Sequence, residues 1–156
     1  MHLEEVLREY GRRQGLGKLE LDDEGICRLM INKTCTISFE ESFSANGFFM
    51  YTAVSMLSHE QEKEMALMAL SANLFGRETG RSYLGYDANT RALVLFEFVS
   101  SEGLTYARFH TYFEEFIYYM LYWISKFEEL QTQAVGEHSL KKGMHRGEED
   151  KNIFFA

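Results

Sequence analysis

The residue types that most often bind metals or carry out covalent catalysis are scattered along this chain. His59 has a carboxylate beside it, at Glu60, but without the HExxH spacing that places two imidazoles on one helix face. The cysteines, Cys27 and Cys35, lie in apolar, strand-like runs, where a thiol behaves as a small buried hydrophobe in a reducing compartment. We therefore predict no metal site, no disulfide and no cofactor. The histidines lie far apart, at His2, His59, His110, His138 and His145.

Catalytic patterns of other kinds are also missing from the sequence. Carboxylates occur as adjacent pairs such as Glu114-Glu115, and adjacent residues on a helix fan out around it instead of converging on one substrate atom. No serine lies in a G-x-S-x-G turn, and no G-x-G-x-x-G or Walker-type loop is present to hold phosphate. We expect no catalytic residues and predict that the protein is not an enzyme.

Composition limits both the location and the partners of the protein. The chain has 156 residues, 46% of them hydrophobic, which suits a single domain with its own core. Its formal net charge of −8 repels phosphate backbones, so we expect no nucleic acid partner. The absence of a long apolar run or a signal-like start predicts a cytoplasmic protein without membrane insertion. Its 13 Phe, 9 Tyr and 8 Met residues exceed what a core of this size needs, so we expect some to be exposed for binding.

Hydrophobic periodicity predicts the elements that position these side chains. The predicted order is helix, three strands, helix, two strands, helix, which indicates a single α+β domain over residues 1–135 with helices packed against an antiparallel sheet. The last helix has an aromatic seam at a spacing of three or four residues, which we expect to pack on the sheet. Residues 136–156 are charged and aperiodic and are predicted to form a mobile C-terminal tail whose apolar end, 153–155, could dock. The elements are expected at residues 2–14, 26–31, 34–41, 48–54, 58–75, 81–87, 92–99 and 105–133.

The middle helix is apolar on nearly every side after Glu64, so other parts of the protein must cover it on two sides. Its own sheet can cover one side, and a second subunit is the simplest cover for the other, so we predict a homodimer. One face of the helix carries Met65, Met68, Ala69 and Ala72, and another carries Leu67, Leu70 and Leu74; the sequence does not decide which face dimerises. The dimer-interface candidates are Met65, Met68, Ala69, Leu70 and Ala72.

Two stretches of the sequence resemble a known family. Gly15-Leu16 leads through Asp22 and Gly25 into the first strand, and the run 69–75 (ALSANLF) is followed by Glu78-Thr79-Gly80 and by 83–87 (YLGYD). These patterns resemble the Tir-chaperone (CesT-like) class I type III secretion chaperones, and the similarity runs from about Leu3 to Leu130. The family's frequent proline after the third strand is replaced here by Met56-Leu57-Ser58.

The resemblance implies a homodimeric cytoplasmic chaperone. Such a protein binds an N-terminal segment of one or more secreted effectors, keeps it soluble and partly extended, and delivers it to the secretion apparatus and its ATPase. By position, the first helix and the three-stranded sheet are the implied effector-binding elements, and about half of their apolar residues must face the core. Asn73 is expected to be a structural hydrogen-bonding residue. The effector-binding candidates are Leu3, Val6, Leu7, Leu29, Ile31, Ile37, Phe39, Phe49 and Tyr51.

Two other functions are compatible with the sequence. The first is a regulatory module of the same shape that sequesters a transcriptional regulator or an anti-activator. The second is a small-molecule enzyme with a cleft between the sheet and the long helix, where His110 and tyrosines would supply polar groups.

Overall fold

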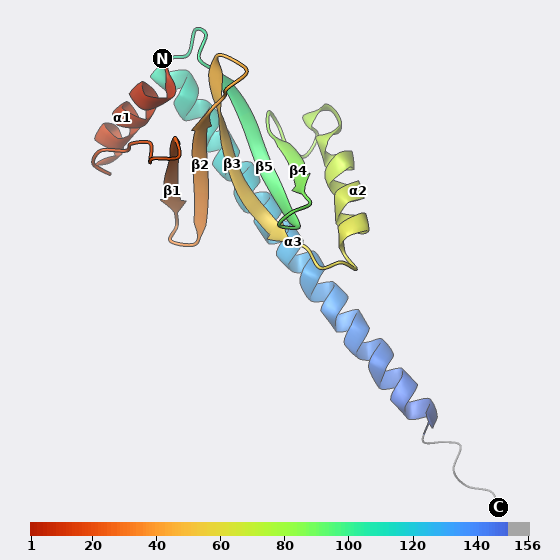
Figure 1. Ribbon diagram of the computed structural model, residues 1–156. Helices are drawn as coiled ribbons and strands as arrows, with labels where there is room; N and C mark the ends of the chain where they lie inside the picture. Colours follow the sequence, from red (N-terminus) through yellow and green to blue (C-terminus); the bar gives the residue numbers. More distant parts are fainter. Residues whose placement is uncertain (150–156) are drawn as a thin grey trace, which may run out of the picture.

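The computed structural model describes the backbone of residues 1–149 and the side chains of residues 1–133. The predicted order of elements and the α+β class are confirmed (Figure 1). A short 3-10 turn, η1, follows the middle helix. The elements are α1 (Leu3–Gln14), β1 (Ile26–Ile31), β2 (Cys35–Glu41), β3 (Gly47–Met56), α2 (Glu62–Asn73), η1 (Leu74–Gly76), β4 (Tyr83–Asp87), β5 (Ala92–Ser100) and α3 (Tyr106–Glu149).

All five strands form one antiparallel sheet in the order β1-β2-β3-β5-β4. Short turns join β1 to β2, β2 to β3 and β4 to β5, as expected for strands that pair with their sequence neighbours. The chain between β3 and β4 forms α2, which packs beside β4 at one end of the sheet. Strands β1 and β4 are therefore the two edges.

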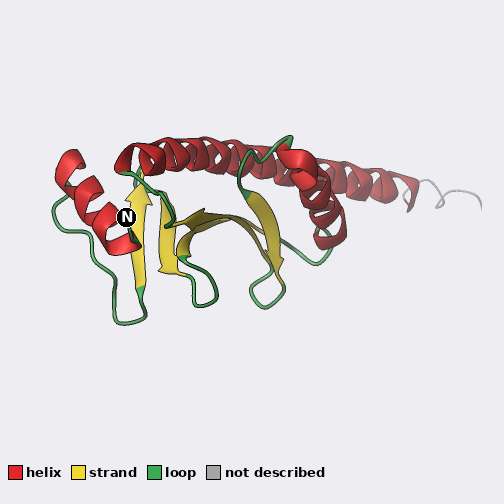
Figure 2. Ribbon diagram, turned by 90° about the horizontal axis from the view of Figure 1, so that it is seen from above, coloured by secondary structure: helices red, strands yellow, loops and turns green. Residues whose placement is uncertain are grey.

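The helices leave one face of the sheet uncovered. Helix α3 runs along the other face, while α1 and α2 lie at opposite ends of the sheet (Figure 2). Among the described residues, no helix crosses the remaining face, which we call the open face. None of the described helices is long and apolar enough to span a membrane.

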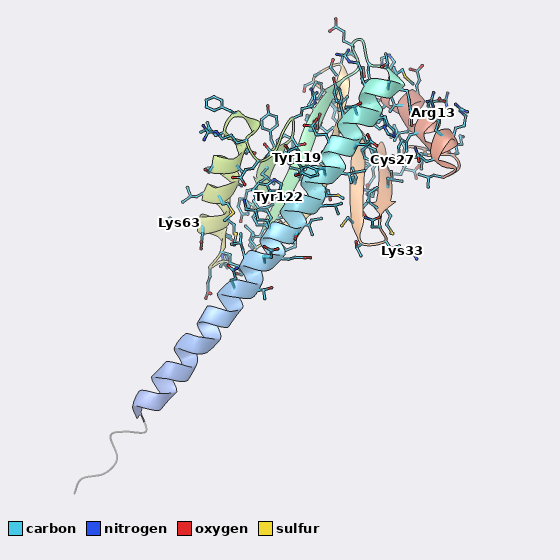
Figure 3. All side chains as sticks on the ribbon, turned by 180° about the vertical axis from the view of Figure 1, so that it is seen from behind. Arg13, Cys27, Lys33, Lys63, Tyr119 and Tyr122 are labelled. Atoms are coloured by element: carbon cyan, nitrogen blue, oxygen red, sulfur yellow. The ribbon has the colours of Figure 1, made fainter. Side chains whose placement is uncertain are left out.

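The core lies between the sheet and α3. The predicted aromatic seam is confirmed, because its side chains are fully buried except that of Leu130, which is half-buried against the core. The indole of Trp123 donates a hydrogen bond of 2.9 Å to the carbonyl oxygen of Glu78, which ties α3 to the segment after α2. Tyr119 and Tyr122 lie on the side of α3 that faces α2 (Figure 3). The seam consists of Phe109, Phe113, Phe116, Met120, Trp123, Phe127 and Leu130.

Helix α1 closes the other end of the core. Its first turn carries Glu4 and Glu5, whose negative charges favour a helix N-terminus, and Gly15 ends it in the left-handed conformation at φ 68°. Tyr10 meets the ring of Phe113 edge-on at 5.2 Å. The amphipathic pattern of the first residues therefore serves packing against α3.

Strand ends differ from the prediction by one or two residues, and two predicted helix boundaries are wrong by more than that. Helix α2 begins at Glu62 because the preceding residues form a turn in which the Ser58 hydroxyl donates to the side chain of Gln61. Helix α3 does not end at Gln133 but continues to Glu149, through part of the segment predicted as a tail. That segment contains no proline, so its glycines weaken the helix without ending it. Mobility of residues 136–156 stays a prediction, and the apolar residues 153–155 lie outside the described part.

Candidate protein-binding surfaces

The open face of the sheet is rich in aromatic side chains. Phe49 and Tyr51 on β3 are paired in register with Phe98 and Phe96 on β5, and Tyr83 on β4 is paired with Phe96. The Phe49 and Phe98 rings lie 5.3 Å apart and those of Tyr83 and Phe96 lie 5.9 Å apart. Tyr83 is 53% exposed and Phe98 is 36% exposed. The face is thus a continuous aromatic surface that no described helix covers.

Most of the predicted effector-binding residues do not lie on the open face. In each strand successive side chains point to opposite faces, and the buried hydrophobic side chains are those that face α3. Ile31 is half-buried against the core, and Phe49 and Tyr51 belong to the open face. Six of the candidates are buried, so their assignment to a binding surface is wrong. Their side chains form the core between the sheet, α1 and α3. The buried set is Leu3, Val6, Leu7, Leu29, Ile37 and Phe39.

The edge formed by β1 has backbone groups that face away from the sheet. The N–H of Ile26 donates to the Asp22 carboxylate at 3.0 Å, and its carbonyl accepts from the Asp22 N–H at 2.9 Å, so Ile26 faces outward. By the alternation of an antiparallel strand, the backbone groups of Arg28 and Met30 also point outward. The Met30 side chain is 64% exposed. This edge can therefore accept another strand.

The opposite edge is blocked by a side chain. The Asn73 amide donates to the Leu84 carbonyl at 2.9 Å, and its oxygen accepts from the Leu84 N–H at 2.8 Å. Both outward-facing backbone groups of Leu84, the second residue of β4, are therefore occupied. The prediction that Asn73 is a structural hydrogen-bonding residue is confirmed, and its place at the end of α2 positions it there.

The structure shows which face of α2 packs on the core of its own subunit and which face is exposed. Met65, Ala69 and Ala72 are buried within the subunit beside β4, which corrects their assignment to a dimer interface, and Met68 packs partly against the same core. Leu70 is 67% exposed. It lies beside other exposed apolar residues that the candidate set omitted, although their spacing of three or four residues already indicated a second face. We call this exposed face the leucine face; it comprises Leu67, Leu70, Leu74 and Phe75.

Phe75 is the most exposed member of the leucine face, at 86%. Its backbone has φ 58°, in the left-handed region that bulky residues rarely adopt. Such a conformation costs of order 1–3 kcal/mol, so the turn after α2 holds an aromatic ring in water at an energetic cost. That combination favours a contact with another chain.

A buried carboxylate lies on the covered face of the sheet, directly behind the aromatic residues of β5. Glu97 on β5 is 1% exposed and accepts hydrogen bonds from Arg81 at 2.9 Å and from Ser82 at 3.2 Å. Burial raises the pKa of Glu97 above its usual range, and the bonds from Arg81 and Ser82 oppose that rise. Arg81 in turn stacks on the ring of Tyr112 at 3.8 Å. The network joins β5, the segment just before β4, and α3, and it satisfies a charge that would otherwise be costly to bury.

Groups with metal-binding or nucleophilic chemistry do not converge. Within residues 1–133, no group of His, Cys, Asp and Glu side chains is arranged to hold a metal ion. Cys27 is buried and its pKa is raised, chiefly by burial, which disfavours the reactive thiolate. The described surfaces have the features of a protein-binding module: an aromatic sheet face, an open strand edge and an exposed apolar helix face.

Comparison with known proteins gives the same class. The family model for the Tir chaperone protein (CesT) family matches residues 5–123. A Chlamydia pneumoniae protein is 27% identical over 125 residues, covering 79% of this chain and 94% of its own length. The Tir chaperone of Citrobacter freundii is 26% identical over 90 residues, covering 58% of this chain and 56% of its own. The chain belongs to the Tir chaperone protein (CesT) family.

Solved structures share the fold. A chain of the HopA1–SchA chaperone–effector complex superimposes with a TM-score of 0.64 at 16% identity, over 78% of this chain and 92% of that one. A chain of the ExsC–ExsE complex has a TM-score of 0.64 at 19% identity, over 80% and 96%. At such identities these likenesses bear on the fold alone.

Proposed function

We propose that this protein is a homodimeric, cytoplasmic, non-enzymatic chaperone for one or more type III secretion effectors. It holds an N-terminal segment of the effector soluble and partly extended, and delivers it to the secretion apparatus and its ATPase. One observation carries the proposal beyond family membership: the sheet has an uncovered aromatic face on β3, β5 and β4 and, beyond β2, an edge at β1 whose backbone groups point outward.

A bound protein segment can use the two features with different stretches of its chain. One stretch pairs its backbone with the outward groups of Arg28 and Met30 on β1, and another packs apolar side chains on the aromatic face of β3, β5 and β4. Each leucine-sized side chain contributes about 1.5 to 3 kcal/mol before the cost of ordering the peptide, so several contacts are needed. Because backbone pairing is independent of side-chain identity, one chaperone can serve different sequences.

The leucine face supplies the second contact surface. An exposed stripe of this kind on one helix can be covered by the same stripe of a second copy around a two-fold axis. Met65, Ala69 and Ala72 hold the other side of the helix on the subunit's own sheet. Dimerisation and folding thus use different faces of α2.

Co-purification tests the proposal. The tagged chain is expressed in a bacterium that carries the matching secretion system, and the bound protein is identified together with the mass of the intact complex. Recovery of a secreted protein bound to a chaperone dimer supports the proposal. Recovery of only a non-secreted regulator favours the sequestration function, and a bare monomer contradicts the chaperone proposal.

A matched pair of variants ties the result to the open face. Replacing Phe49 and Phe98 by serine removes two rings of that face, whereas replacing Tyr118 by serine removes a 63% exposed ring on α3. The double variant should release most of the bound protein, and the Tyr118 variant should retain it. Equal retention by both would place cargo binding elsewhere.

A further inference from the structure

A pocket at one end of the open face differs from the rest of that surface. It lies beside the turn between β2 and β3, has a volume of about 470 Å³, and is lined mainly by apolar atoms. Phe43, at the tip of the turn, is fully exposed. The remaining aromatic walls come from β3 and β5. The lining residues are Glu40, Glu41, Ser42, Phe43, Ser44, Phe49, Tyr51, Val94 and Phe96.

The charged residues that line this pocket are both acidic. Its only charged lining residues are Glu40 and Glu41. The Tyr51 hydroxyl donates to Glu40 Oε2 at 3.0 Å, which leaves the other carboxylate oxygen of Glu40 for a ligand. Arg28, on the neighbouring strand, is already paired with Asp22 and Glu24 at the sheet edge. The lining therefore carries negative charge without a basic residue of its own.

Aromatic rings beside carboxylates bind one kind of side chain well. The negative face of a phenyl or phenol ring attracts a cation, and a nearby carboxylate adds an ionic hydrogen bond. Arginine suits such a site best, because its planar guanidinium stacks on rings and pairs with two carboxylate oxygens. Its aliphatic stem would cover the apolar walls.

We propose that this pocket is a specificity site for an arginine side chain flanked by apolar residues in the bound protein segment. The inference rests on the proposed function, since it names what the chaperone selects within its cargo. An aromatic sheet alone accepts any apolar residue. Glu40, on the open face, would add a preference for a basic position in a fixed register relative to the β2–β3 turn, and Glu41, at the end of β2, would add negative charge at the rim of the pocket.

The test uses a defined peptide and the full-length chain. Acetyl-Ser-Val-Arg-Val-Ser-amide and the same peptide with glutamine in place of arginine are titrated into the isotope-labelled chaperone, and amide shifts are followed by NMR. The arginine peptide should shift resonances around Phe43, Tyr51 and Phe96, with a Kd at least about fivefold below that of the glutamine peptide. Raising the salt concentration should reduce the difference.

Variants link the preference to the pocket. The double change E40Q/E41Q keeps the shape of the lining and should bring the two peptides to within about twofold of each other. The control E102Q removes one exposed carboxylate between β5 and α3 and should leave the preference intact. Dispersed spectra of each variant establish that it is folded.

Three results would overturn the proposal: equal affinity for both peptides, shifts confined to other parts of the chain, or no shift at these resonances up to about 5 mM peptide. These results are separate from the co-purification. If a secreted protein is captured but the peptides bind equally, only the arginine site fails. If no secreted protein is captured and the peptide preference is found, the chaperone function fails and the site stands.

Discussion

The two faces of the sheet carry similar side chains with opposite surroundings. Phe39 and Phe48 lie under α3 with almost no exposure, whereas Phe98, on the reverse of the same sheet, is 36% exposed. Helix α2 repeats the contrast, with Met65 buried and Leu70 exposed. Aromatic and aliphatic residues on one side of each element fold the subunit, and those on the other side are left for other chains. The following predictions test that division.

The largest difference in unfolding free energy is expected between substitutions of two phenylalanines. Phe116→Ala opens a cavity in the core under α3 and should lower the free energy of unfolding by about 3–5 kcal/mol, whereas Phe98→Ala should cost less than about 1 kcal/mol. Urea denaturation followed by circular dichroism measures both values. Similar costs at the two positions would remove the distinction between the faces.

Asn73→Ala tests the blocked edge of β4. The change leaves the N–H and C=O of Leu84 without their partner, which should cost about 1–3 kcal/mol of unfolding free energy. It should also promote concentration-dependent association, since an open edge strand pairs readily with another chain. Denaturation and light scattering provide the readouts. Asn89→Ala, at an exposed turn position, is the control and should behave as wild type.

Glu97 on the covered face should give a pH dependence of defined sign. Its pKa is raised in the folded state, so the folded protein binds the proton more strongly than the unfolded chain does. Stability should therefore fall as the pH rises from the unfolded to the folded pKa, and stay level above it. Comparing Glu97→Gln with wild type across this range should show the decline only in the wild type. An identical pH profile for the two proteins would contradict the burial argument.

The smallest effect on subunit stability is expected at the leucine face. Leu70→Asp places a charge in the proposed dimer contact and should yield monomers by analytical ultracentrifugation, while thermal unfolding of the isolated subunit changes little. Met65→Asp, on the buried face of the same helix, should unfold the chain instead. A Leu70→Asp protein that remains a stable dimer would show that α2 does not form the interface.

Much of the fold could be predicted because local patterns carry it. The alternation in β2 and the three-to-four spacing of Phe109, Phe113 and Phe116 each indicate an element with one buried side. The residues at which the helices begin and end are harder to predict from the sequence. The end of α3 was missed because the charged stretch after Gln133 has no apolar period, and α2 began late because Ser58 and Gln61 pair within a turn rather than capping the helix.

The candidate binding residues show what the sequence pattern does not predict. Periodicity groups residues by face but does not say which face a neighbouring element covers. Leu3, Val6 and Leu7 were assigned to a binding surface by resemblance and are buried, and Leu67 and Leu74 were left out of the interface set and are exposed. The pocket beside Phe43 had no signal in the sequence, because its walls come from three strands brought together only by their register.

The sequence by itself determined the order of elements, the α+β class, the excess of aromatic side chains and the role of Asn73. These depend on periodicity, composition and short-range hydrogen bonding, which are local properties of the chain. The tertiary structure alone decided which face of the sheet α3 covers, which side of α2 stays exposed, and that β1 rather than β4 keeps an open edge. Those outcomes depend on how helices distant in sequence pack against the sheet, and no local pattern encodes that choice.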